Sequence, residues 1–202
     1  MNPLSPVRNS TIVRRYDLHS LEEKLKNKTA LQEQLGWPEE PKCPLFYLPA
    51  GMNKSLGGAL FKEILPGLLT LNVQLIIRGK GSNEYGSLFT ELAKTHSHRI
   101  AIIPDREERR SQMYTAADGA LFLADPSTLP ELKHCLQYGV VPIAPECKAL
   151  ENYNPIQESG NAFLYEKLDP WHCFAALVRA LETHCFPFDW RTIQRHCMES
   201  VQ

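Results

Sequence analysis

The sequence has no excess of charge of either sign, because 22 Lys and Arg residues stand against 23 Asp and Glu residues, a formal net charge of −1. It therefore has no basic field that would attract nucleic acid or an anionic membrane surface. It also lacks a long uncharged apolar run, and its first residues are polar and include Arg8, Arg14 and Arg15. Neither a membrane span nor a secretory signal is predicted. We expect a cytoplasmic protein with no nucleic-acid or membrane partner.

Closely paired cysteines are absent as well. None of the six cysteines belongs to a Cys-x-x-Cys pair, although four of them directly follow a histidine. Adjacent residues of a helix do not share a face, so a His-Cys dipeptide is a poor chelate for a metal. We predict free, buried thiols and no metal site.

The residues that are present favour one globular domain, since the chain has 202 residues of which 43% are hydrophobic. We expect residues 1–20 to form an irregular N-terminal arm and residues 21–202 to form a single domain. Short apolar runs bounded by Gly, Pro or Asp predict six strands. These runs are Leu45–Leu48, Val73–Ile77, Arg99–Ile103, Ala120–Leu123, Val140–Ala144 and Ala162–Tyr165.

Helical patterns alternate with these strands. A helix is predicted from Ser20 to Leu35, and a second one carries the apolar residues from Leu60 to Leu69, where Pro66 should kink it or mark its last turn. Three aspartates are predicted to cap helices. They are Asp105 before Arg106–Thr115, Asp125 before a helix starting near Ser127, and Asp169 before a helix with Pro170 at its first position. A last helix should run from Asp189 to about Met198.

This alternation predicts an α/β fold with a doubly wound, mostly parallel six-stranded sheet, Rossmann-like in its connections. Ligands of such sheets bind outside the carboxyl ends of the strands. The loops to inspect are therefore residues 49–58, 78–83, 104–106, 124–129 and 144–150.

Four segments resemble the C-terminal domain of bacterial glycogen synthase and plant starch synthase: Lys26–Gly36, Glu63–Leu69, Val73–Gly81 and Tyr138–Ile143. The resemblance extends from about Tyr16 to Met198. It implies half of a two-domain, GT-B glycosyltransferase, whose chemistry is glucosyl transfer from ADP- or UDP-glucose to an α-1,4-glucan. The C-terminal half holds the nucleotide diphosphate, and an N-terminal domain supplies most of the acceptor-binding residues. The chain is therefore expected to be an excised or truncated domain, with a glucan, a glycosyltransferase N-terminal domain or another protein as partner and no resident cofactor.

The first ligand loop departs from the family pattern. The family has an arginine and, five residues later, a lysine that neutralise the diphosphate, and these positions are Gly51 and Leu56 here. Lys54 is the nearest replacement, beside the retained Gly57, although it also fits an ordinary surface lysine. Each lost charge-assisted hydrogen bond removes roughly 1.5–3 kcal/mol, so donor binding should weaken by roughly a hundredfold to ten-thousandfold.

The other loops depart in similar ways. Asp125 stands near the position of the family's sugar-binding glutamate and is the one candidate catalytic residue, with the amides of Ser127 and Thr128 as phosphate donors. Lys148 is a further candidate contact, but the neighbouring Glu146 would repel a diphosphate.

Two further candidates follow the second and third strands. Gly79 keeps a framework position of the family, and Arg106 is the residue that could stack on the nucleotide base, since Asp105 falls near the place of the family's aromatic residue.

Three functions remain open at this stage. The chain is a synthase-type domain that has lost catalysis, or a working glycosyltransferase that uses Lys54, Asp125 and Lys148, or a non-catalytic assembly or regulatory module. The first and third predict that nucleotide sugars do not bind.

Overall fold

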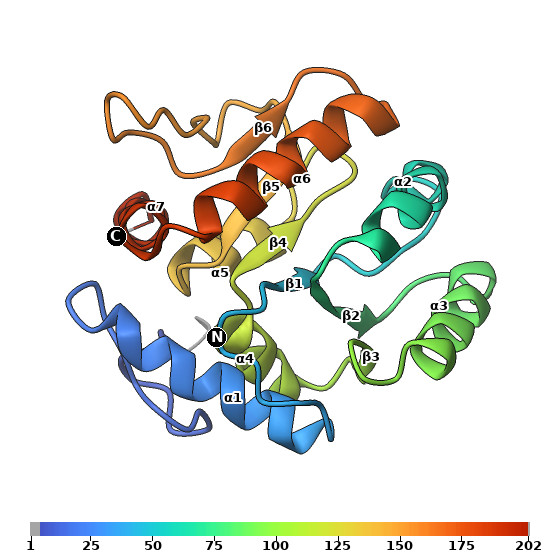
Figure 1. Ribbon diagram of the computed structural model, residues 1–202, viewed down its shortest axis with the longest axis horizontal. Helices are drawn as coiled ribbons and strands as arrows, with labels where there is room; N and C mark the ends of the chain where they lie inside the picture. The colour runs from blue at the N-terminus through green and yellow to red at the C-terminus, as the bar shows by residue number, and fades with distance from the viewer. Residues whose placement is uncertain (1–4, 202) are drawn as a thin grey trace.

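The computed structural model describes residues 5–201, which form a twisted sheet with helices on both faces (Figure 1). The six strands are β1 (Leu45–Leu48), β2 (Gln74–Gly79), β3 (Ile100–Pro104), β4 (Gly119–Leu121), β5 (Val141–Pro145) and β6 (Phe163–Tyr165). Every neighbouring pair is parallel, and the order is β3-β2-β1-β4-β5-β6. The doubly wound fold is therefore confirmed, and the order reverses between β1 and β4, where such folds bind ligands.

A short 3-10 turn, η1 (Leu21–Glu23), leads into α1 (Lys24–Gln34). The other helices are α2 (Gly58–Thr70), α3 (Asn83–Thr95), α4 (Glu107–Ala116), α5 (Pro130–Gln137), α6 (Pro170–His184) and α7 (Pro187–Glu199). Helices α2, α3 and α6 cover one face of the sheet, and α1, α4, α5 and α7 cover the other (Figure 1). Within residues 5–201 no helix could cross a membrane, since the longest, α6, has 15 residues.

The predicted strands agree with the observed ones to within two residues at each end, because each is a buried apolar run. Helix α3 was not predicted. Its sequence is mostly polar, and only Tyr85, Phe89 and Leu92 form its buried face. Pro66 lies inside α2, which continues for four more residues to Thr70.

Two predicted helix caps, Asp105 and Asp125, were wrong. The N-cap of α4 is Arg106, without a side-chain hydrogen bond, and α5 begins at Pro130 rather than near Ser127. In both cases the nearby aspartate makes other hydrogen bonds, described below. Asp169 does cap α6, because its side chain accepts a hydrogen bond from the backbone N–H of His172 at 2.9 Å.

The amino-terminal ends of the strands are joined by one buried ion pair. Lys28 of α1 lies 2.6 Å from Asp118, which precedes β4, and the same carboxylate oxygen accepts the backbone N–H of Leu45 at 2.8 Å. Residues 5–20 form no helix or strand, yet Tyr16 is buried and its hydroxyl donates to the carbonyl oxygen of Tyr138 at 2.8 Å. The N-terminal segment is thus packed against the domain.

Candidate functional site at the carboxyl edge of the sheet

The predicted site residues all lie in loops or helix starts at the carboxyl edge of the sheet. Lys54 and Gly57 follow β1, Gly79 ends β2 and Arg106 follows β3. Residues 125–128 follow β4, and Lys148 follows β5. Because β1, β4 and β5 are neighbours in the sheet, the topology brings the loops that carry Lys54, Asp125 and Lys148 to adjacent positions.

The loop after β1 is held by its own backbone and by the loop after β2. Met52 pairs with Gly81, and its N–H donates to the carbonyl of Lys80 at 3.0 Å. Gly51 has φ +75°, and a Cβ atom there would lie 2.2 Å from the carbonyl oxygen of Lys80. The position that carries the family's arginine therefore cannot hold any side chain unless this loop changes shape.

Gly57 is the contact between this loop and the segment that follows β4. It has φ +85° and forms the N-cap of α2, and a Cβ atom there would lie 2.3 Å from the carbonyl oxygen of Leu123. Asn53 closes the preceding turn, since its side-chain oxygen accepts the N–H of Leu56 at 2.9 Å. The start of α2 thus has no side-chain cap, and its free N–H groups and the positive end of the helix dipole favour an anion.

Lys54 projects from the tip of this turn. It is exposed, and within the described part of the chain it has no ion-pair partner. Lys54 is the cation of the first loop, two residues before Leu56, where the resemblance expects a lysine that contacts the diphosphate.

A buried arginine occupies the region between the ends of β1, β2 and β3. The Arg78 guanidinium binds both carboxylate oxygens of Asp105, at 2.9 and 3.2 Å, and Glu131 at 2.5 Å. It also donates to the carbonyl oxygen of Pro49 at 3.0 Å. Arg110 binds Asp105 from the other side at 2.7 Å. Four chain segments are therefore joined by one ion cluster, made of Arg78, Asp105, Arg110 and Glu131.

The electrostatics of this cluster are satisfied internally. Burial would lower the pKa of Arg78, but the hydrogen bonds to Asp105 and Glu131 raise it above its ordinary value. Burial would likewise raise the pKa of Asp105, and the hydrogen bonds from Arg78 and Arg110 hold it below its ordinary range. Arg78 is the only buried guanidinium among the described residues of this edge, and it is already neutralised by carboxylates.

The crevice between β1 and β4 is almost closed. Its cavity has a volume of about 10 Å³, which is room for about one water molecule. Its walls are apolar side chains and backbone, among them Met52, Leu56, Phe122 and Leu129. The crevice itself offers no charged group to a ligand.

Asp125 stabilises a turn. Its Oδ1 accepts the backbone N–H of Ser127 at 2.9 Å and the Ser127 hydroxyl at 2.5 Å. These two hydrogen bonds hold the pKa of Asp125 below its ordinary value. The carboxylate is exposed and ionised, with Oδ2 free of any protein hydrogen bond within the described residues. It is not held like a buried general acid, which would need a raised pKa at neutral pH.

The remaining candidates are surface groups. Ser127 and Thr128 are exposed ahead of α5, and Lys148 and Glu146 are exposed in the loop after β5. Gly79 lies against β3, where a Cβ atom would be 3.1 Å from the carbonyl oxygen of Ile103. The exposed Arg106 directly precedes α4 as its N-cap. All of these positions are exposed.

Sequence reasoning missed Arg78 and Glu131. The signal was present in the Leu-Ile-Ile-Arg run that ends the second predicted strand, because a cation at the end of a buried strand requires carboxylate partners. The identity of those partners depends on the folding of distant segments.

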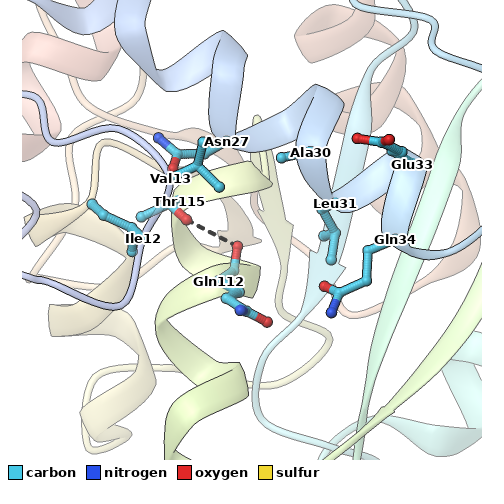
Figure 2. Close-up of a pocket in the computed structure, with 9 residues that line it drawn as sticks. All are labelled: Ile12, Val13, Asn27, Ala30, Leu31, Glu33, Gln34, Gln112 and Thr115. Atoms are coloured by element: carbon cyan, nitrogen blue, oxygen red, sulfur yellow. Dashed lines mark hydrogen bonds between the residues drawn. The ribbon is translucent and has the colours of Figure 1, made fainter.

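Two larger cavities lie away from this edge. One, of about 500 Å³, opens between α1, α4 and the N-terminal segment at Ile12 and Val13 (Figure 2). The other, of about 880 Å³, lies at the amino edge of the sheet. Within residues 5–201 no group of three or more His, Cys, Asp or Glu side chains could hold a metal ion.

Comparison with known proteins identifies relatives of this domain, although no family model matches the chain. Glycogen synthase from Bacillus cytotoxicus is 30% identical over 201 residues, which are 96% of this chain and 42% of that protein. Glycogen synthase from Fervidobacterium nodosum is 28% identical over 96% of this chain and 41% of its own length. This chain thus spans less than half the length of these curated relatives, and it corresponds to their C-terminal part.

Solved structures show the same fold. The catalytic domain of starch synthase IV from Arabidopsis thaliana, bound to ADP and acarbose, superposes with a TM-score of 0.85 at 19% identity, over 98% of this chain and 43% of that one. The C-terminal domain of a group 1 glycosyl transferase from Francisella tularensis superposes with a TM-score of 0.64 at 13% identity, over 87% of this chain and 91% of that one. The expected resemblance and the GT-B type of Rossmann-like domain are both confirmed.

Proposed function

We infer that this chain, which is homologous to the C-terminal part of glycogen synthases, acts in α-glucan metabolism as a glycosyltransferase-type domain that does not itself transfer glucose. Its donor would be ADP- or UDP-glucose, bound too weakly for turnover. The single observation that carries this proposal is the ion cluster, in which Arg78 is already bound by Asp105 and Glu131 and offers no charge to a diphosphate.

Two further observations support weak donor binding. Gly51 cannot accept an arginine, because its φ of +75° and the Lys80 carbonyl oxygen exclude a side chain. Glu146 presents a carboxylate beside Lys148 in the loop after β5, where repulsion opposes a bound phosphate. The remaining attractive groups are Lys54, Arg106 and the backbone at the start of α2. Exposed contacts of this kind contribute about 0.3–1 kcal/mol each.

Calorimetric titration of the chain with ADP, ADP-glucose and UDP-glucose tests the proposal. We expect dissociation constants weaker than about 1 mM, a binding free energy of roughly −4 kcal/mol. The catalytic domain of Arabidopsis starch synthase IV, which was solved with ADP, is the positive control. Binding of any of the three ligands tighter than 1 mM would support a working glycosyltransferase that uses Lys54, Asp125 and Lys148.

A second candidate function is a module that binds a glucan or a protein partner, such as a glycosyltransferase N-terminal domain. It is favoured by Leu168 and Trp171, which are 64% and 83% exposed where α6 begins at the carboxyl edge. An exposed indole ring can stack on a sugar ring or enter a protein interface. A glucan partner would be favoured if glycogen in a native gel retards the chain and Trp171→Ala abolishes this retardation. A protein partner would be favoured if the chain is purified from cells in a stable complex.

We place this function in the cytoplasm. Support comes from the cysteines, all six of which are unpaired in the structure, with Cys43, Cys135, Cys173 and Cys197 buried. Free thiols are typical of a reducing compartment.

A further inference from the structure

A second site lies at the opposite edge of the sheet from the ligand loops. The cavity there, which we call the amino-edge cavity, has a volume of about 880 Å³. It is bordered by α1, by the segment before β1, by the end of α2 and by the junction of α6 and α7. Pockets that hold small molecules typically measure about 300–1,000 Å³, so the amino-edge cavity has the size of a ligand site.

The walls of the amino-edge cavity are mainly apolar. Leu25, Leu71, Leu181 and Pro187 contribute from three different helices and one loop. Leu25 is 45% exposed, although it faces a cavity rather than a flat surface. A ligand of this cavity is therefore expected to have an apolar body.

The charged groups of the lining are mostly positive. Lys28, Lys42 and Arg191 line the cavity, against Glu22 and Asp118, and Lys24 also lines it, with a pKa that burial lowers to about 7. Asp118 is already bound by Lys28 at 2.6 Å, with His184 at 3.6 Å. Lys42 and Arg191 are exposed, and neither has a carboxylate partner within residues 5–201. Lys42 and Arg191 thus outnumber Glu22, which is likewise exposed and without an ion-pair partner among the described residues, and this excess of cations complements an anion.

Trp190 contributes an aromatic wall to the cavity. Its ring is 5% exposed and lines the cavity, with the His184 ring packed edge-on at 5.0 Å between centroids.

We propose that the amino-edge cavity binds a small amphipathic anion, a molecule with an alkyl or aryl body and one carboxylate or sulfonate group. The apolar body lies against Leu25, Leu71 and Leu181, and the acidic group is held by Lys42 and Arg191. This site is independent of nucleotide-sugar binding, since it occupies the other edge of the sheet.

Calorimetric titration of the intact chain with decanoate tests the proposal. Displacement of the fluorescent anion 8-anilinonaphthalene-1-sulfonate by decanoate is a second measurement. We expect one site per chain. The charge-reversed double variant Lys42→Glu/Arg191→Glu should bind decanoate at least tenfold more weakly. The matched control Lys94→Glu/Lys133→Glu, which reverses two exposed lysines on α3 and α5, should bind as the wild type does.

The apolar part of the site is tested separately. Leu25→Trp fills the cavity from an exposed helix position, so the fold should survive and binding should fall at least tenfold. Decanol, which has the same body without the charge, should bind at least tenfold more weakly than decanoate. The proposal is overturned if decanoate does not bind, or if the two charge-reversed proteins bind decanoate with equal affinity. It is also overturned if light scattering shows a dimer that Leu25→Glu dissociates, because a second copy of the chain would then cover the cavity.

Discussion

The Arg78 guanidinium and the Glu131 carboxylate lie 2.5 Å apart, and they join the end of β2 to the first turn of α5. The two residues are separated by 53 positions, and both side chains are almost fully buried. This ion pair lies at the carboxyl edge of the sheet, where a ligand would be expected, so the Arg78 charge is bound by a protein carboxylate instead of a ligand.

Removing the arginine should destabilise the domain strongly. Arg78→Met leaves the Glu131 carboxylate buried without a partner, and we expect the free energy of unfolding in urea to fall by about 3–5 kcal/mol. Lys94→Met, on the exposed face of α3, is the matched control and should change it by less than about 0.5 kcal/mol. The double variant Arg78→Met/Glu131→Gln should recover part of the loss; if it is no more stable than the single variant, the ion pair is not the cause.

Stability should fall in acid because of Asp118. Burial would raise the pKa of Asp118, but the charge of Lys28 and its hydrogen bond to the carboxylate hold the pKa far below its ordinary value. The folded state therefore binds this proton more weakly than the unfolded chain does. The stabilisation is fully present above the unfolded pKa of about 4 and is lost as the pH falls below it.

Urea unfolding at pH 6, 4 and 3 measures this loss of stability. The variant Asp118→Asn should be less stable than the wild type at pH 6, and its stability should depend less on pH in acid. An unchanged acid dependence in that variant would contradict the assignment.

Gly57 should tolerate no side chain. Gly57→Ala places a Cβ atom 2.3 Å from the Leu123 carbonyl oxygen at a φ of +85°, so we expect a loss of about 1–3 kcal/mol. Gly86→Ala is the matched control, because Gly86 lies in α3 with open space around its Cα. That substitution should stabilise the protein by about 0.5–1 kcal/mol. Thermal unfolding of both variants should therefore shift in opposite directions, and a shift in the same direction would show that the contact with Leu123 is not rigid.

A cation added at the start of α2 should improve nucleotide binding. Leu56→Lys introduces the charge that the family has at this position, and unlike Gly51 it has room for a side chain. We expect the affinity for ADP to rise roughly two- to fivefold, which corresponds to about 0.3–1 kcal/mol. Leu56→Gln provides a control of similar size without charge, and NMR titration at millimolar ADP measures both. Equal affinity of the two variants would indicate that ADP does not approach this loop.

Local patterns were sufficient for most of the framework. The buried strands are short apolar runs, and Asp169-Pro170 marked the start of α6 correctly because a cap and a first-turn proline act within a few residues. The caps predicted at Asp105 and Asp125 failed, since an aspartate beside a helix can also bind a distant arginine or close its own turn.

The sequence by itself determined an α/β fold with a parallel sheet and helices on both faces, because hydrophobic periodicity and turn residues operate over a few neighbouring positions. It also determined which charged groups of the family are missing from the ligand loops, since those follow from residue identity alone. Only the tertiary structure decided that Arg78 is neutralised by Asp105 and Glu131 and that Gly51 and Gly57 are pressed against other loops. These contacts join residues far apart in the chain, and their geometry exists only once the strands are in register.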